Sequence, residues 1–365
     1  MRTFHPFAVR GFTDQTVRQT LRPAGSGEAL RIRLSNRYGT APLEVGGAHL
    51  AVRTRGSGID PATDTTLLFA GLETATVPPG DEIVTDPAEQ PVTAGEELAL
   101  SPYVPGDTGL TTYSAVPYDI GHATPGNRLT ADHCDTAEEL PTGHFVTGVD
   151  VRAPHGTRIA VAFGDSWIEG MNTTPGTGSA FPAQLNSHLT RGWIVNQGIS
   201  GNRLLTDEIG EHLLAASTAT SSPSPAPRTS SSTSASTTSA CPAPSPSPTP
   251  ANPHRRRPDD RPDRTRRPPA RRRTHRHRQH HRPLRRHVYP GYDTEEGQSV
   301  RREVNTWLLG DTHPLYAVAD LAAAVADPDR PDRIRDAFNS GDGLHVNDAG
   351  AKALADAVDL TLLRL

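Results

Sequence analysis

The chain has 365 residues, enough for two ordinary domains, but 34 prolines, 32 glycines and an apolar fraction of only 34% do not suit one compact fold. The net charge of −4 hides an imbalance, because residues 254–287 hold fifteen arginines and three aspartates, whereas the remainder holds 22 basic against 38 acidic residues. Cys134 and Cys241 lack metal-ligand spacing and argue against a disulfide framework or a zinc site. No run approaches the roughly 20 apolar residues of a membrane span.

The first 23 residues are polar and mixed, and they lack the apolar stretch of a signal peptide. As the sequence is written, we expect a cytoplasmic protein without a membrane partner.

Residues 1–153 are predicted to form an all-β accessory domain. Leu30 to Leu34 alternates apolar and basic residues, as a half-buried strand does, and similar short runs recur as far as Leu100. Turn-forming clusters such as Asn36-Arg37-Tyr38-Gly39 separate these runs. Many short strands with regular turns are typical of a β-sandwich or jelly roll.

From residue 154 the pattern changes to alternating strands and helices. Arg158 to Phe163 is an apolar run that stops at Gly164-Asp165-Ser166, which predicts a buried parallel strand with Ser166 at its carboxyl end. The following elements are expected to be a helix over Phe181 to Leu189, a strand over Trp193 to Asn196 and a helix over Leu204 to Leu214. Residues 154–214 are therefore assigned to an α/β domain.

Residues 215–288 interrupt this domain. Their first half is almost entirely Ser, Thr, Ala and Pro, and their second half is mostly Arg, His and Pro. Such a segment cannot bury enough apolar surface to fold, so we expect it to be disordered as written.

The α/β pattern resumes over residues 289–365. Helices are expected over Ser299 to Leu309 and Leu321 to Val325, and a closing helix is expected after Asn347, which is a suitable N-cap. Asp342-Gly343-Leu344-His345 directly precedes this closing helix.

Ser166, His345 and Asp342 are the candidate catalytic residues. Asp342 lies three residues before His345 on one loop, so its carboxylate can hold one ring nitrogen while the other nitrogen faces a serine hydroxyl. An ordinary loop followed by a capped helix would show the same spacing, so the spacing alone leaves both interpretations open.

Three segments together resemble the SGNH (GDSL) hydrolase family. They are Phe163-Gly164-Asp165-Ser166 after a strand, Asn196-Gln197-Gly198-Ile199-Ser200-Gly201-Asn202, and the segment from Asp342 to Gly350 before the final helix. The β domain is similar to the amino-terminal module of one secreted bacterial branch of that family. Relatives of this type are usually exported, so the resemblance implies an extracellular location if the start is misassigned.

The resemblance implies a three-layer α/β/α (flavodoxin-like) catalytic domain with serine esterase chemistry that needs neither a metal nor a cofactor. By matching motif, Ser166 is the expected nucleophile, His345 the general base and Asp342 the residue that orients it. The backbone N–H groups of Ser166 and Gly201 are the expected oxyanion donors. The expected substrate is a small carboxylic ester or an acylated carbohydrate, and the oligomeric state is left open.

One family block, Gly-x-Asn-Asp, is missing from the sequence. Its asparagine supplies a third oxyanion donor in the family, and the only Asn-Asp here is Asn347-Asp348 in the closing segment. Two alternatives to an active esterase therefore stay open. The chain is either a catalytically impaired member of this family, or its Arg-rich segment binds nucleic acid through phosphate contacts. Because that segment has no interleaved aromatic residues, no specific nucleic acid is expected as a partner.

We interpret residues 215–288 as GC-rich coding sequence read in a shifted frame. With Ser as TCx, Thr as ACx and Ala as GCx, reading Ser234 to Ala240 two bases along permits Gly-Val-Asn-Asp-Ile-Gly, which contains the missing block. Reading upstream residues 216–226 in the same way permits an apolar stretch that begins Val-Asp-Arg-Asp-Val-Leu.

The frame interpretation predicts that resequencing the gene across codons 210–295 finds inserted or missing bases that restore Gly-x-Asn-Asp. A confirmed frame would contradict it, and the insert would then be a genuine part of a chain that has lost this block.

Overall fold

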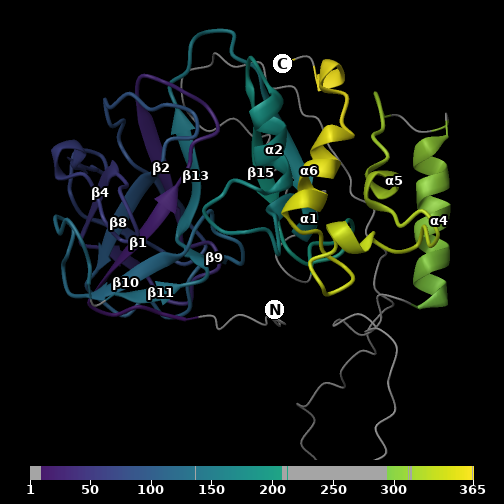
Figure 1. Cartoon of the computed structure of the whole chain (residues 1–365). Helices are drawn as coiled ribbons and strands as arrows, with labels where there is room; N and C mark the ends of the chain where they lie inside the picture. The colour runs from purple at the N-terminus through teal and green to yellow at the C-terminus, as the bar shows by residue number, and fades with distance from the viewer. Residues whose placement is uncertain are drawn as a thin grey trace, which may run out of the picture.

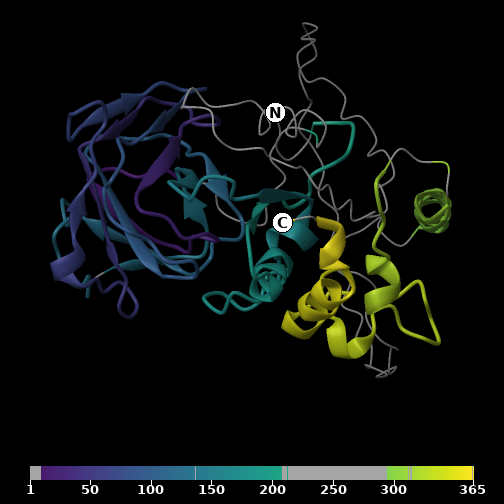
Figure 2. The ribbon, with the colours of Figure 1, turned by 90° about the horizontal axis from the view of Figure 1, so that it is seen from above.

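The computed structural model describes residues 10–135, 137–207, 212, 294–310, 312, 315–363 and 365. The predicted disordered segment 215–288 lies outside these ranges, so its disorder stays a prediction. The two larger apolar cores of the described residues are separate, one formed by the amino-terminal strands and one formed by the elements that follow residue 158 (Figures 1 and 2).

The amino-terminal part consists of short antiparallel strands. They are β1 (Gln15–Leu21), β2 (Leu30–Ser35), β3 (Leu43–Val45), β4 (Gly47–Val52), β5 (Thr65–Thr66), β6 (Ala75–Val77), β7 (Glu82–Val84), β8 (Leu98–Val104), β9 (Tyr113–Ser114), β10 (Gly121–Pro125), β11 (Glu138–Leu140), β12 (Gly143–His144) and β13 (Val146–Val151), with one 3₁₀ turn, η1 (Pro61–Thr63). A six-stranded sheet has the order β11-β10-β1-β8-β4-β5, and a three-stranded sheet has the order β13-β2-β7. The pairs β12-β9 and β3-β6 complete the set.

The alternation predicted for Leu30 to Leu34 is confirmed in β2. Leu30, Ile32 and Leu34 are buried, whereas the arginines between them point to the other face. There Arg33 donates from Nε and Nη2 to the two carboxylate oxygens of Asp150 in β13, at 2.9 and 2.8 Å. A bidentate pair of this kind fixes the register of β2 against β13 as well as adding attraction.

Both larger sheets contribute to one core. Val17 of β1, Leu50 of β4 and Leu100 of β8 pack in the same cluster as Ile32 and Leu34 of β2. Two antiparallel sheets that share a core in this way form a sandwich, as the turn spacing predicted.

The later elements form a smaller α/β unit. They are β14 (Ile159–Gly164), α1 (Ser166–Glu169), α2 (Phe181–His188), β15 (Trp193–Gly198), α4 (Glu295–Leu309), α5 (Leu321–Val325), η2 (Asp336–Phe338), α6 (Asp348–Asp356) and η3 (Leu360–Leu363). The strands β14 and β15 are parallel and pair from Ile159 with Trp193 to Gly164 with Gly198. Ala160 and Ala162 of β14 pack in one core with Leu185 of α2, Leu321 of α5 and Leu354 of α6.

The expected three-layer α/β/α fold is not established. Over the described residues the α/β unit has a single sheet, and that sheet has two strands. The expected helix over Leu204 to Leu214 is wrong at its start, because Leu204, Leu205 and Thr206 form a bend and both leucines are exposed. Most of the remainder of that predicted helix lies outside the described residues.

The helix α4 stands at the outer edge of the unit, beyond α5 as seen from β14 and β15 (Figures 1 and 2). Gly297 is its one buried residue. The apolar residues Val300, Val304 and Trp307 share one face and are 40%, 39% and 48% exposed. Arg301 and Arg302 tie α4 to Asp332.

Within the described ranges, no helix combines the length and apolar character needed to span a bilayer. The same residues contain no cluster of three or more His, Cys, Asp or Glu side chains suited to a metal ion.

A buried histidine makes the stability of the β domain depend on pH. The ring nitrogens of His144 lie 2.9 Å from the hydroxyls of Thr111 and Thr142, and the residue is 2% exposed. Burial lowers the pKa of His144 to about 4, and the positive charge of Arg10 adds to this effect. In the unfolded chain the same ring has its ordinary pKa of about 6.5. Protonation therefore favours the unfolded chain as the pH falls from about 6.5 towards about 4.

We expect His144 to lower the free energy of unfolding by about 2 kcal/mol between pH 7.5 and pH 5. Urea unfolding of the full chain, followed by circular dichroism at both pH values, measures this loss. His144→Gln keeps one donor and one acceptor for the two threonines but does not titrate, so its loss should be smaller by about that amount. Equal losses in both proteins would contradict the assignment.

Candidate active site

The strand β14 delivers Ser166 to the carboxyl edge of the two-stranded sheet. The strand ends at Gly164, where a Cβ atom would lie 2.4 Å from Cγ1 of the fully buried Ile168, so the chain can turn closely here only with glycine. Asp165 then caps α1 by accepting the N–H of Trp167 at 3.0 Å. Ser166 is the first residue of α1 and is 8% exposed.

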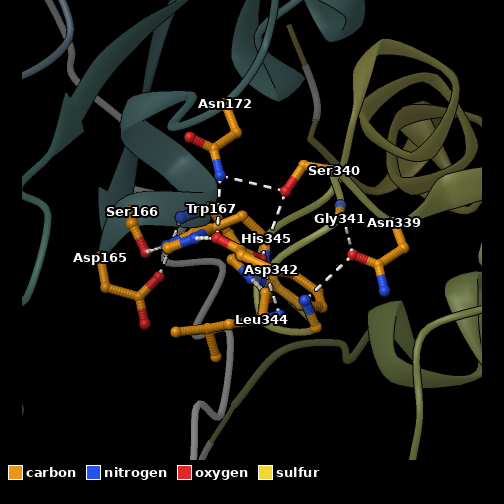
Figure 3. A network of polar contacts seen from close by, with 11 residues as sticks. Asp165, Ser166, Trp167, Asn172, Asn339, Ser340, Gly341, Asp342, Leu344 and His345 are labelled. Atoms are coloured by element: carbon orange, nitrogen blue, oxygen red, sulfur yellow. Dashed lines mark hydrogen bonds and ion pairs between the residues drawn. The ribbon is translucent and has the colours of Figure 1, made fainter. Parts of the chain in front are cut away.

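The structure brings the three candidate residues together (Figure 3). The hydroxyl Oγ of Ser166 lies 2.9 Å from Nε2 of His345, and Nδ1 of His345 lies 2.6 Å from Oδ2 of Asp342. Ser166 and His345 are 179 positions apart in the chain, and both are buried. Asp342, His345 and Ser166 therefore form one continuous chain of hydrogen bonds.

The loop that carries Asp342 is fixed by its own polar groups. Oδ1 of Asp342 accepts the backbone N–H groups of Leu344 and His345 at 2.9 and 2.8 Å. The left-handed backbone of Gly341 and Gly343, with φ of 104° and 78°, closes the loop around these bonds. The loop is thus held in shape by hydrogen bonds within its own segment.

These contacts decide the charge of Asp342. Burial by itself would raise the pKa of its carboxyl, but the hydrogen bonds from the His345 ring and from the N–H groups of His345 and Leu344 outweigh burial. The pKa of Asp342 therefore lies well below its usual value. Because an ionised carboxylate only accepts, His345 carries its proton on Nδ1, and Nε2 is left to accept the Ser166 hydroxyl proton.

Two further bonds join the segment after Ser166 to the closing loop and helix. Nε1 of Trp167 donates to the carbonyl oxygen of Leu344 at 2.9 Å. The N–H of Thr174 donates to Oδ1 of Asp348, the first residue of α6, at 2.8 Å. The serine and the histidine are therefore held by bonds that join their two segments directly.

Asn172 belongs to the same network, although the sequence does not single it out. Its Nδ2 donates to Oδ2 of Asp342 at 2.9 Å and to Oγ of Ser340 at 3.0 Å (Figure 3). Its φ of 65° is left-handed, a conformation that asparagine tolerates better than most residues. The one available signal was an asparagine in the glycine- and threonine-rich loop after the serine, and that signal is weak.

The glycine-bearing turn after β15 lies at the same sheet edge as Ser166. The N–H of Ile199 donates to the carbonyl oxygen of Gly164 at 3.0 Å, so this turn runs beside the one that delivers the serine. Gly201 has a left-handed φ of 77° and sits at the start of the bend that leaves the sheet. Gly201, the expected second oxyanion donor, therefore lies in the turn that follows β15, and its role stays a prediction.

The described residues hold no Gly-x-Asn-Asp block. The side chain of Asn347 accepts the N–H of Gly350 at 3.0 Å as the N-cap of α6, and its Nδ2 donates to the carbonyl oxygens of Ala337 and Asn339. Asn347 is therefore committed to the closing helix and is not the missing donor.

No family model matches the chain, and no curated protein matches it. Among solved structures it is similar to an active-site mutant of a family two carbohydrate esterase from Clostridium thermocellum, with a TM-score of 0.15, 11% identity and coverage of 55% of this chain and 49% of that one. An acetyl xylan esterase from Butyrivibrio proteoclasticus gives a TM-score of 0.17, 8% identity and coverage of 55% and 45%. A family two carbohydrate esterase from Cellvibrio japonicus gives a TM-score of 0.15, 10% identity and coverage of 54% and 47%.

The chain spans about half the length of these solved structures. Similarity at such TM-scores does not establish a common fold, so roles for Ser166, His345 and Asp342 depend on the geometry of the site alone.

We expect Asn172→Asp to lower the free energy of unfolding by about 2 kcal/mol at pH 7. The change is nearly isosteric, but it replaces the amide donor by a second carboxylate, so the hydrogen bonds from Asn172 to Asp342 and Ser340 are lost and two like charges meet. The loss should shrink at pH 4, where the new carboxyl is largely protonated. Urea unfolding at both pH values measures it.

Asn127→Asp is the matched control for Asn172→Asp. Oδ1 of Asn127 accepts the N–H of Leu129, and an aspartate keeps this acceptor. A loss in Asn172→Asp no larger than that of the control would contradict the placement of Asn172 against Asp342.

Proposed function

We propose that the protein is a serine esterase of the SGNH type that hydrolyses small carboxylic esters. One observation carries this proposal: the Ser166 hydroxyl lies 2.9 Å from Nε2 of a histidine whose Nδ1 lies 2.6 Å from a carboxylate. A serine, a base within hydrogen-bond reach and a third group that orients the base are the parts of an activated nucleophile.

In the first half-reaction, Oγ of Ser166 attacks the carbonyl carbon of the ester while its proton moves to Nε2 of His345. The carbonyl electron pair moves onto the oxygen and forms a tetrahedral oxyanion. When this intermediate collapses, the bond to the alcohol oxygen breaks, and that oxygen takes the proton from His345. The alcohol leaves and an acyl-Ser166 ester remains.

In the second half-reaction, water replaces the alcohol. His345 takes a proton from water as the water oxygen attacks the acyl carbon. The collapse of the second tetrahedral intermediate returns the proton to Oγ of Ser166 and releases the carboxylic acid. Asp342 stays ionised and holds the imidazole in one tautomer throughout.

The backbone N–H groups of Ser166 and Gly201 are the proposed donors to the oxyanion. The motif of the SGNH family supports these assignments, as does the position of both residues at the edge where β14 and β15 end. Absence of the third, asparagine donor would cost about 10²–10³ in rate. A catalytically impaired enzyme is therefore the second candidate, and the missing block is the observation that favours it.

The proposed substrates are small esters, with acetylated carbohydrates as the natural class to test. The proposed catalytic fold is the three-layer α/β/α arrangement of this family, of which β14, β15 and their helices would be part.

Hydrolysis of 4-nitrophenyl acetate should be lost in Ser166→Ala and His345→Ala. Asp342→Asn should lower kcat by about 10⁴-fold, because the carboxamide no longer enforces the tautomer that accepts the serine proton. Release of nitrophenol measures the aryl ester, and release of acetate from acetylated xylo-oligosaccharides measures the carbohydrate class.

His188→Ala on α2 is the matched control, because it removes a partly exposed histidine that contacts Asp356 at 3.8 Å and lies outside the triad. Equal rates in wild type, Ser166→Ala and His345→Ala would contradict the proposal. A rate that needs Ser166 but stays low on every ester would favour the impaired enzyme.

A further inference from the structure

The carboxylate of Glu169 joins the β domain to the turn that carries Gly201. Its Oε1 accepts the hydroxyl of Ser114 in β9 at 2.8 Å, and its Oε2 accepts the backbone N–H of Ser200 at 2.6 Å. Ser200 immediately precedes Gly201, the proposed oxyanion donor. One side chain therefore spans two segments that are 86 positions apart in the sequence.

The backbone of Glu169 is itself held against the same turn. Glu169 is the last residue of α1, and a Cβ atom at Gly198 would lie 2.1 Å from the Glu169 nitrogen, so the end of β15 touches the end of α1. Nδ2 of Asn196 donates to the carbonyl oxygen of Glu169 at 3.3 Å. The helix that begins at Ser166 thus ends at a residue whose position is set by β15 and whose side chain reaches the turn.

The β-domain side of this bridge is also fixed. Ser114 pairs with Gly143 of β12, and its hydroxyl oxygen accepts the N–H of Val116 at 3.3 Å. The neighbouring Tyr113 feels the charge of Glu169. Burial raises the pKa of Tyr113 to about 12, and the negative charge of Glu169 acts in the same direction.

A second contact from the same β-domain segment reaches the loop that carries Asn172. The N–H of Gly176 donates to the carbonyl oxygen of Tyr118 at 2.8 Å, and the Tyr118 hydroxyl donates to the carbonyl oxygen of Gly176 at 2.9 Å. The β-domain segment 113–118 therefore contacts the loop of Asn172 directly and is linked to the turn of Ser200 through Glu169.

We infer that Glu169 is a positioning residue for the oxyanion turn, and that Ser114 of the β domain holds it in place. This inference rests on the proposed function. By fixing the N–H of Ser200, the carboxylate sets the direction of the next peptide, which presents the N–H of Gly201. Donors to an oxyanion stabilise the transition state only when they are held in position beforehand.

Hydrogen–deuterium exchange of peptides that cover residues 196–203 tests the positioning without any need for activity. We expect exchange in this turn to be faster in Glu169→Ala than in wild type. In Glu169→Gln we expect exchange to be slower than in Glu169→Ala, because the carboxamide oxygen can still accept the N–H of Ser200. Ser114→Ala keeps the Glu169 carboxylate but removes the hydroxyl that donates to it. Exchange over residues 196–203 should therefore rise above wild type, but by less than in Glu169→Ala.

The catalytic part of the inference is read from kcat and KM on 4-nitrophenyl acetate. Glu169→Ala should lower kcat about 10–100-fold with a change in KM of less than about threefold, and Glu169→Gln should recover most of the loss. A reversible boronic acid that forms a tetrahedral adduct with Ser166 should lose affinity in parallel with kcat/KM, as expected for a defect in the oxyanion site.

Glu303→Ala, on the exposed face of α4, is the matched control. Unchanged exchange over 196–203 in both Glu169→Ala and Ser114→Ala would overturn the inference, as would faster exchange with unaltered kcat. A wild-type protein without any hydrolysis would contradict the proposed esterase instead, and the exchange experiment would still decide whether Glu169 and Ser114 hold the turn.

Discussion

The carboxylate of Asp342 is the group on which the geometry of the site depends. It accepts the ring N–H of His345, two backbone N–H groups of its own loop and the side chain of Asn172. The same oxygen atoms thus set the shape of the closing loop, the orientation of the imidazole and the contact with the segment after Ser166. An ionised carboxylate can accept all of these bonds at once, whereas a protonated one would have to give up at least one acceptor position. The hydrogen bonds that order the loop are therefore also those that keep Asp342 charged.

The β domain takes part in this arrangement through a short segment. Strand β9 and the residues that follow it lie on the side of the β domain that faces α1 (Figure 1). Ser114 reaches Glu169, and Tyr118 reaches Gly176, so the two contacts fall on either side of Asn172. The cores of the β domain and of the α/β unit are separate. Hydrogen bonds of this kind restrict the movement of one part relative to the other near Ser166. These contacts give the β domain a direct physical link to the loops near Ser166.

Local patterns allowed much of this structure to be predicted. The apolar run that ends at Gly164 predicted β14 and the place of Ser166, and Asn347 predicted the start of α6, because strand termination and helix capping depend on neighbouring residues. The contact of Ser166 with His345 followed only from the combination of motifs, since no spacing along the chain encodes a distance across 179 positions. Asn172 and Glu169 could not be predicted, because their partners come from other segments and their roles depend on folded geometry. The helix predicted from Leu204 is wrong at its start, where residues 204–206 form a bend and both leucines are exposed.

The apolar face of α4, formed by Val300, Val304 and Trp307, is only partly buried. Most of the stability of a helix in a protein comes from packing of its apolar face, yet Val300, Val304 and Trp307 are 40%, 39% and 48% exposed. Over the described residues the sheet of the α/β unit has two parallel strands, and parallel sheets in proteins are usually covered on both faces. The frame-shift hypothesis for residues 215–288 predicts that the restored sequence supplies further apolar residues to this unit. The frame that permits Gly-Val-Asn-Asp-Ile-Gly also permits, upstream, an apolar stretch that begins Val-Asp-Arg-Asp-Val-Leu. A genuine Arg-rich insert explains neither feature, because arginine, proline and serine cannot supply the apolar surface that these elements need.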